Sequence, residues 1–351
     1  MMRKRLTSRT ATGLAIGAVV LSATSTFGQA PAARGAKPPA ARKWTLPRTP
    51  DGHPDLQGIW NNSTTTPLQR PDALADKVVL TEEETAALNQ QVDRGGLPGS
   101  GTYRNTDLPP DAGDPGTYNE FWWERGKSIG RTSLIIDPPD GRLPLTPDGR
   151  KRVEARAEAI RRHPADSWED RSLQERCIIY HGIPPLPTGY NNNYTIVQTK
   201  DHVAILHEMI HEVRIIPLDG RPHLGQGIRL WMGDSRGRWE GDTLVVETTN
   251  FTDKLLSLSG IGIFGTGTPT MRVVERFTRV DADTIDYRFT VEDPGTFTKP
   301  FTALLPMRKT EGPLYEYACH EGNYGLMGIL SGARAQEKAR EKKGEGARQD
   351  Q

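Results

Sequence analysis

Hydrophobic and polar residues alternate most regularly between residues 271 and 294, in the second half of the chain. There Ile285, Tyr287, Phe289 and Val291 are each separated from the next by one polar residue. A period of two places the hydrophobic side chains on one face of a β-strand and the polar ones on the other. A similar run precedes them, so the segment predicts an antiparallel hairpin with one buried face and one wet face.

Further strand patterns lie on both sides of this hairpin. They occupy residues 193–206, 233–251, 298–307 and 312–322. Lys200 and Asp201 predict a tight turn within the first of these segments. In the second, residues 235–237 predict a turn before a strand through Leu244. Because successive antiparallel hairpins are typical of barrels and sandwiches, we expect a mainly β domain over residues 174–330, built as an antiparallel barrel or a sandwich.

The first half of the chain is rich in proline, glycine and aspartate and contains two helix patterns. Thr81 and Glu84 have the spacing of a capping box at the start of residues 80–94. Residues 146–163 follow turn-forming residues with a run of good helix formers. The remaining turns connect only short hydrophobic pieces. We therefore expect residues 46–173 to form a wrapping region with two helices.

The ends of the chain have no core-forming pattern. Residues 1–30 contain basic residues, an apolar stretch at 14–23 and then small residues, which predicts an export signal; an uncleaved anchor is the alternative. Residues 31–45 resemble a linker, and residues 331–351 a charged tail that is mobile or a frayed helix. No other segment is apolar for long enough to cross a bilayer, so we expect an exported protein, periplasmic or secreted, without stable membrane insertion after cleavage.

Charge and cysteine content narrow the function classes. The first thirty residues carry four positive charges and no negative ones, so their removal changes the formal net charge from +1 to −3. A nearly neutral chain lacks the excess of basic residues that is typical of proteins that bind nucleic acid or an anionic membrane. Cys177 and Cys319 are the two cysteines. In an exported chain they predict one disulfide, and two separate buried thiols are the alternative.

The segment His-Glu-Met-Ile-His, which begins at His207, is the most suggestive motif. On a helix, this H-E-x-x-H pattern binds zinc through His207 and His211 and supplies Glu208 as the general base. Its context favours a strand instead, because it follows a β-branched run and continues into another that ends at Pro217. On a strand, residues four apart lie about 13 Å from each other, too far to share a zinc ion.

The strand interpretation assigns other roles to these residues. His207 and His211 would line the interior of the β domain as general bases or hydrogen-bond donors, unless they are core histidines satisfied by the backbone. Glu208, Glu212 and Arg214 would lie on the opposite face, where cross-strand ion pairs are expected.

Another candidate for acid/base chemistry follows the second cysteine. His320 and Glu321 come directly after Cys319, at the predicted end of a strand and beside the predicted disulfide. A histidine next to a carboxylate is suited to proton transfer. A structural corner is the alternative.

Five residues are candidates for ligand binding. The adjacent Trp122 and Trp123 are suited to stacking on an aromatic ligand, or else to packing as a lid. Arg221 and His223 lie in a glycine-containing loop that could grip an anion, or form a structural turn. Trp239 completes a Gly-x-Trp triplet of the kind that seals one end of lipocalin-like barrels, which is a weak likeness in shape.

Three longer strings resemble a family of exported bacterial proteins of unknown function. They are RIIPLDGRPH (214–223), GDSRGRWEGDTLVV (233–246) and YACHEGN (317–323). The resemblance covers most of the mature chain and implies no activity, cofactor or catalytic residue.

The leading functional hypothesis is the binding of a small amphipathic or aromatic molecule in a cavity of the β domain, extended to its conversion by acid/base chemistry. This hypothesis needs no cofactor. A zinc-dependent hydrolase, with zinc on the histidine motif, and a structural envelope protein without a ligand are the alternatives. The sequence leaves the identity of the ligand and the oligomeric state open.

Overall fold

The computed structural model describes residues 44–93, 124, 126–180, 182–254, 268 and 270–349. All of them belong to one compact unit, Trp44–Gln351. The predicted export signal and nearly all of the linker lie outside the described residues, as do Trp122 and Trp123.

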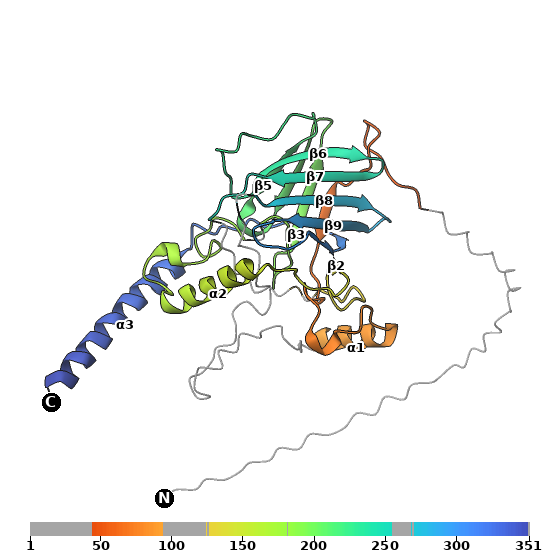
Figure 1. Ribbon diagram of the computed structural model, residues 1–351. Coiled ribbons are helices and arrows are strands. Elements are labelled where there is room, and N and C mark those ends of the chain that lie inside the picture. The colour runs from red at the N-terminus through yellow and green to blue at the C-terminus, as the bar shows by residue number, and fades with distance from the viewer. Residues whose placement is uncertain are drawn as a thin grey trace, which may run out of the picture. The chain divides into compact units, whose positions relative to one another are not determined.

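The described residues form one antiparallel sheet of eleven strands (Figure 1). The strands are β1 (Gly58–Asn61), β2 (Ile135–Asp137), β3 (Asn193–Gln198), β4 (His202–His207), β5 (Val213–Pro217), β6 (Asp234–Glu240), β7 (Thr243–Thr249), β8 (Arg272–Arg279), β9 (Thr284–Glu292), β10 (Phe301–Leu304) and β11 (Met307–Thr310). Their order is β5-β4-β3-β1-β11-β9-β8-β7-β6, with β10 paired to β9 and β2 paired to β10. The prediction of a mainly β, antiparallel domain is confirmed.

The sheet is open and not closed into a barrel. Its end strands, β5 and β6, share no hydrogen-bonded pairing among the described residues. They nevertheless approach each other closely at Gly237 in β6. A Cβ atom there would lie 2.6 Å from Leu218 and 2.8 Å from Ile216, so only glycine fits without a shift of these side chains.

Two predicted hairpins are confirmed, and two details of the prediction are wrong. β3 pairs with β4, and β8 pairs with β9, as the alternation predicted. Residues 235–237 lie inside β6, because the turn to β7 comes later, at Gly241 with a φ of 59°. The described residues between 312 and 322 contain no strand.

Among the described residues, three α-helices and three short 3-10 helices accompany the sheet. They are α1 (Glu82–Asp93), α2 (Pro147–Arg162), α3 (Tyr324–Gln349), η1 (Asp72–Leu74), η3 (Trp168–Asp170) and η4 (Met209–His211). The predicted capping box of α1 is present, since Thr81 N–H donates to Glu84 at 2.8 Å and Glu84 N–H donates to Thr81 Oγ1 at 3.2 Å. The helix α3 covers the segment for which we expected a charged tail.

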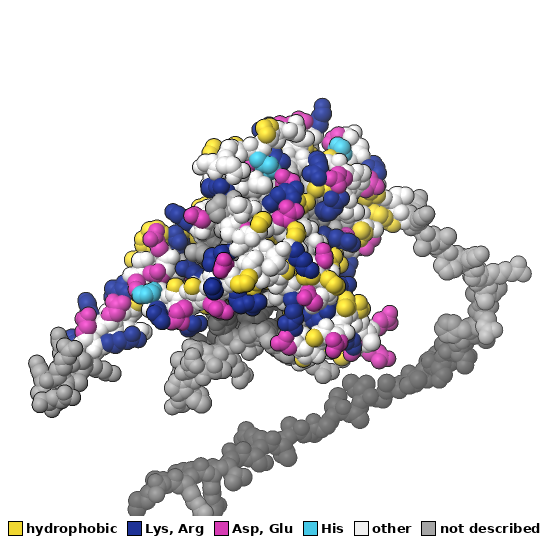
Figure 2. Space-filling model, viewed as in Figure 1, with side chains coloured by type: hydrophobic (Ala, Val, Ile, Leu, Met, Phe, Trp, Pro, Cys, Tyr) yellow, Lys and Arg dark blue, Asp and Glu magenta, His cyan; other side chains and the backbone are white. Residues whose placement is uncertain are grey.

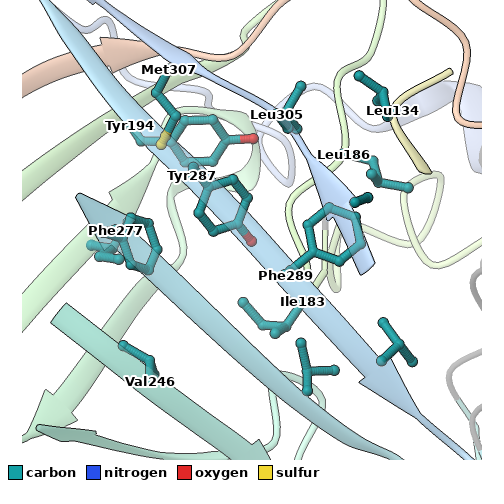
Figure 3. Close-up of a cluster of buried hydrophobic side chains, with 14 of the residues drawn as sticks. Leu134, Ile183, Leu186, Tyr194, Val246, Phe277, Tyr287, Phe289, Leu305 and Met307 are labelled. Atoms are coloured by element: carbon teal, nitrogen blue, oxygen red, sulfur yellow. The ribbon is translucent and has the colours of Figure 1, made fainter. Parts of the chain in front are cut away.

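The hydrophobic core fills the inner face of the curved sheet. Figure 3 shows Tyr194, Tyr287 and Phe289 pointing into the same cluster. Trp60 of β1 is fully buried, and the guanidinium of Arg279 lies 5.4 Å from its ring centroid. Arg279 also donates to backbone carbonyl groups, among them Asp55 O at 2.7 Å. This arrangement seals the core at the start of the first strand.

The structure therefore assigns the sealing role to another Gly-x-Trp triplet. Trp60 completes the triplet Gly-Ile-Trp on β1, which sequence analysis did not single out. Trp239 lies on β6 instead, is partly buried, and stacks on His53 with ring centroids 4.9 Å apart. Trp239 is a packing residue in this structure.

A disulfide joins Cys177 to Cys319, as predicted, and bridges 142 positions of the sequence. Asn323, just before α3, donates to Glu175 O at 2.8 Å and to Cys177 Sγ at 3.3 Å. These contacts fasten the C-terminal segment to the loop that precedes β3. Among the described residues, no helix combines the length and the apolar character needed to span a membrane.

Candidate functional site

The histidine motif forms neither an α-helix nor one continuous strand. β4 ends at His207, and a short turn containing the 3-10 helix η4 leads to β5, which runs back antiparallel to β4. Ile210 reverses the chain with a φ of 63°, a value that is unusual for a β-branched residue. His207 N–H closes the turn by donating to Glu212 O at 2.9 Å. The prediction of a strand through the whole motif is therefore wrong beyond His207.

The turn exchanges the two faces of the segment. Val203, Ile205 and His207 are buried, as the strand interpretation required. After the turn Val213 and Ile215 are exposed, whereas Arg214 is buried, the opposite of the expectation. Because β5 is a separate strand, its inward face is set by the turn and not by the alternation that begins in β4.

The α-helix that the zinc interpretation requires is not formed. The described residues contain no group of three or more His, Cys, Asp or Glu side chains that could hold a metal ion. His207 itself lies at the end of a strand, with its ring edge-on to Tyr194 at a centroid distance of 5.0 Å. The side chain of His211 lies outside the described part of the structure.

Glu208, the general base of the alternative zinc interpretation, belongs to a different cluster. The carboxamide nitrogen of Asn193 donates to Glu208 Oε2 at 2.7 Å and to Glu124 Oε1 at 3.3 Å. Glu208 N–H also donates to Asn193 O at 3.0 Å. One amide group of β3 thus holds two carboxylates together. We call Glu124, Glu208, Asn61, Asn192 and Asn193 the carboxylate site.

Strand register brings the asparagines of this site together. Asn61 and Asn193 are directly paired across β1 and β3, and their side chains share a hydrogen bond of 2.8 Å. The next residue back, Asn192, donates to Glu124 Oε2 from its backbone N–H at 3.1 Å and from its side chain at 3.0 Å. Asn61 donates to the same oxygen at 2.7 Å. The carboxylate of Glu124 is therefore held by amide donors from two strands.

Glu208 and Asn192 are shielded from water, whereas Glu124, Asn61 and Asn193 are partly exposed. Glu208 is 8% exposed. Burial raises the pKa of its carboxyl, and the nearby charge of Glu124 raises it further, whereas the hydrogen bond from Asn193 opposes the shift. A carboxyl group with a raised pKa keeps its proton to a higher pH than an ordinary glutamate, which suits it to proton exchange.

Tyrosines border the carboxylate site. Tyr194, next to Asn193, is fully buried, and burial raises the pKa of its phenol, as do the neighbouring charges of Glu124 and Glu208. Burial also raises the pKa of Tyr180 to about 12, with Tyr190 as a neighbouring group. Tyr317, which hydrogen-bonds to Tyr190, has a pKa raised by burial in the same way. These phenols remain neutral over the physiological range, and they supply aromatic surface together with hydroxyl groups.

A second polar cluster lies inside the sheet. Arg214 of β5 forms two hydrogen bonds to the fully buried carboxylate of Glu275 in β8. Its guanidinium also donates to Ser235 at 2.9 Å and to Thr248 at 2.8 Å, and Tyr287 donates to Glu275 at 2.9 Å. All the polar atoms named here have partners, and Arg214 links the end strand β5 to β6, β7 and β8. The cluster is therefore structural. Arg214 does form an ion pair, but with a buried partner inside the sheet and not on the face where it was predicted.

The other predicted site residues lie elsewhere. Arg221 is exposed and pairs with Asp219 in its own turn. His223 lies between Asp234, at 2.9 Å, and Glu247, at 3.4 Å, and so fastens the loop to β6 and β7. These contacts correspond to the structural alternative for the loop.

His320 and Glu321 are exposed on the turn before α3. Among the described contacts, none joins either of them to His207 or Glu208. Trp122 and Trp123, which lie outside the described residues, immediately precede Glu124 in the sequence.

Sequence analysis missed Glu124 and the asparagines of the carboxylate site. Glu124 lies 69 positions before Asn193, so no local pattern connects them. The available signal was the run of three asparagines that ends at Asn193, directly before a predicted strand.

Comparison with known proteins adds no relative. No family model matches the chain, no curated protein matches it, and no solved structure matches it.

Proposed function

We propose that this protein binds a small amphipathic or aromatic molecule at the carboxylate site, and that Glu208 exchanges a proton when the ligand binds. The observation that carries the proposal is the contact of one carboxamide, that of Asn193, with both Glu124 and Glu208. Holding two carboxylates together in a shielded place is unfavourable for stability. Such an arrangement is expected where the two carboxylates bind a ligand or exchange a proton.

The surroundings fit a ligand that is both polar and aromatic. Tyr180, Tyr190 and Tyr317 are partly buried neighbours of one another. Tyr180 also neighbours the phenol of Tyr194, which in turn neighbours both carboxylates. Ligand sites commonly combine an aromatic lining with a few convergent polar groups. In this proposal Glu208 has the acid/base role. The ring of His207 packs edge-on against Tyr194, the residue next to Asn193, and has no direct part in it.

We also propose that the chain is exported. The predicted signal over residues 1–30 supports this, and the disulfide between Cys177 and Cys319 is compatible with an oxidising compartment. A ligand from outside the cytoplasm is then the natural partner.

A thermal-shift measurement tests the binding proposal. The mature protein is heated with phenethylamine, 2-phenylethanol or phenylacetate, which share one aromatic skeleton but differ in charge. A ligand that binds only the folded state raises the melting temperature. We expect at least one of the three to raise it for the wild type and not for Asn193→Ala. If none of them shifts it, the binding proposal is wrong and a structural role without a ligand gains support.

A further inference from the structure

The most exposed large hydrophobic side chains of the described residues lie near the C-terminal end of the chain. Tyr324, Tyr315 and Met327 are 78%, 71% and 71% exposed, more than any other such side chain in this part of the chain. Tyr324 and Met327 both belong to the first turn of α3. Because single exposed hydrophobic residues are common on protein surfaces, their surroundings decide whether they belong to a surface for a partner.

One side of α3 packs against the loop between α2 and η3. Arg334 donates to Ala165 O at 3.0 Å and to Asp166 O at 2.6 Å, and it also pairs with Glu337 in its own helix. The hydrophobic residues on the same side of the helix are partly buried: Leu326, Ile329, Leu330 and Ala333. The opposite side of α3 therefore faces away from this loop.

The opposite side of α3 combines apolar and basic side chains in a fixed order. Residues three or four apart lie on one side of a helix. This spacing connects Tyr324, Met327, Ser331, Ala335, Lys338 and Lys342, and all of them are exposed. We call these residues the α3 stripe. The stripe begins with two large apolar side chains, continues with two small residues and ends with two lysines.

The charge of the α3 stripe is positive and is not neutralised by described neighbours. The stripe contains no acidic residue, because Glu337 and Glu341 fall on the same side of the helix as Arg334. Among the described ion pairs, none includes Lys338 or Lys342.

This positive charge is a local feature of the molecule. The whole chain has 45 basic and 44 acidic residues, so its composition shows no such excess. On the visible face, basic and acidic side chains lie interspersed (Figure 2). The α3 stripe differs from this mixed surface because its basic and apolar side chains have no acidic residue between them.

An anionic lipid bilayer complements both ends of the α3 stripe. Lysines are attracted to anionic headgroups, and tyrosine and methionine favour the boundary between headgroups and acyl chains. We propose that the protein docks on an anionic bilayer through the α3 stripe, with Lys338 and Lys342 at the lipid phosphates and Tyr324 and Met327 in the interface. The helix lies along the surface and does not cross it. This docking is independent of the carboxylate site.

A second copy of the chain fits the α3 stripe less well. In a parallel pair of α3 helices, the lysines of one copy face the lysines of the other. In an antiparallel pair they face Tyr324 and Met327. Neither arrangement offers an acidic partner, so the lysines lose water without gaining a counter-charge. The charge of the stripe therefore favours a lipid surface.

Sedimentation with lipid vesicles tests the proposal. The chain is used without residues 1–30, because the apolar stretch at 14–23 would bind a bilayer by itself; residues 44–351 form a compact unit of their own. Vesicles of equal parts phosphatidylcholine and phosphatidylglycerol are compared with vesicles of phosphatidylcholine alone. We expect the association constant to be at least about tenfold higher for the anionic vesicles, and to fall when sodium chloride is added.

Paired substitutions in α3 locate the binding. Lys338→Gln/Lys342→Gln should weaken binding to anionic vesicles about 25-fold, which is about fivefold for each lysine. Tyr324→Gln/Met327→Gln removes the apolar end of the stripe and should weaken binding about tenfold. Because all four side chains are exposed, both variants should keep the wild-type melting temperature.

A matched variant on α2 controls for charge alone. Arg150→Gln/Lys151→Gln removes two exposed positive charges from another helix, as the lysine variant of α3 does. We expect this variant to change the association constant by less than about twofold, because charges outside the contact surface are screened.

Each outcome decides for or against the α3 stripe. The proposal is wrong if the wild type sediments with neither kind of vesicle, or equally with both. It is also wrong if the α2 variant loses as much binding as the lysine variant of α3. If light scattering shows a wild-type dimer that Tyr324→Gln/Met327→Gln converts to a monomer, the stripe binds a second copy and the lipid assignment is wrong. Loss of binding in both α3 variants, with binding retained in the α2 variant, supports the proposal.

Discussion

The buried ion pair between Arg214 and Glu275 gives the sharpest prediction about stability. Glu275 is fully buried, and the side chain of Arg214 is 3% exposed. The substitution Arg214→Met removes the guanidinium but fills much of its volume. Glu275 then keeps only the hydrogen bond from Tyr287 among its present side-chain partners. A buried carboxylate left without its cation costs about 3–5 kcal/mol, so we expect the free energy of unfolding to fall by this amount.

The double variant Arg214→Met/Glu275→Leu distinguishes charge from packing. It leaves no buried charge, and Ser235 and Thr248 remain bonded to each other at 3.0 Å. Only the Tyr287 hydroxyl loses its acceptor, which costs about 1–3 kcal/mol. We therefore expect the double variant to be more stable than Arg214→Met alone.

Urea unfolding, followed by tryptophan fluorescence, measures these differences. Arg288→Met serves as the matched control, because Arg288 pairs with Asp286 on the exposed face of β9 and should contribute less than about 1 kcal/mol. A loss below about 1 kcal/mol in Arg214→Met would refute the reasoning. So would a double variant that is less stable than the single one.

Three further predictions concern the disulfide, the carboxylate site and a helix cap. Because the Cys177–Cys319 bond constrains a long loop, replacing both cysteines with alanine should lower the free energy of unfolding by about 2–5 kcal/mol, measured in urea without reductant. The raised pKa of Glu208 means that the folded protein binds its proton more tightly than the unfolded chain does. The free energy of unfolding of the wild type, relative to that of Glu208→Gln, should therefore fall as pH rises from the usual glutamate range through that raised pKa, and then level off. Urea unfolding from about pH 4 to about pH 8 measures this. If the free energies of unfolding of the two proteins change with pH in parallel, the prediction is wrong. Thr146 accepts a hydrogen bond from Gly149 N–H at 2.9 Å at the start of α2, so Thr146→Ala should cost about 1 kcal/mol in thermal unfolding, while Thr146→Ser should cost little.

The sequence predicted those parts of the fold in which one local rule acts without interruption. The alternation of Ile285, Tyr287, Phe289 and Val291 continues unbroken through β9, and all four side chains are buried. The capping box at Thr81 also depends only on residues within one helical turn. In such segments the local preference and the tertiary contacts agree, so the pattern alone is sufficient.

The same local rule failed at the histidine motif, because the turn there contains no residue type that is typical of turns. A chain reversal with positive φ normally shows glycine or asparagine, but here Ile210 adopts that conformation. Without a glycine, the predicted alternation continued from β4 into β5, and the two faces of β5 were therefore assigned in reverse. As a result, the burial of Arg214 was not predicted. Its hydrogen bonds, which join β5 to β6, β7 and β8, were not predicted either.

The carboxylate site shows a second limit of prediction from sequence, and its two glutamates illustrate it differently. Glu208 drew attention through its motif, although for zinc chemistry that the turn does not support. Glu124 had no signal, because its partners Asn61 and Asn193 are distant in sequence and meet it only once β1 and β3 are paired. Among the described residues, no arginine or lysine pairs with either glutamate, whereas Glu275, Asp234 and Glu247 each pair with an arginine, and such a difference is a property of the folded chain. The site therefore has to be derived from the contacts of the folded chain, because the residues that form it share no local sequence pattern.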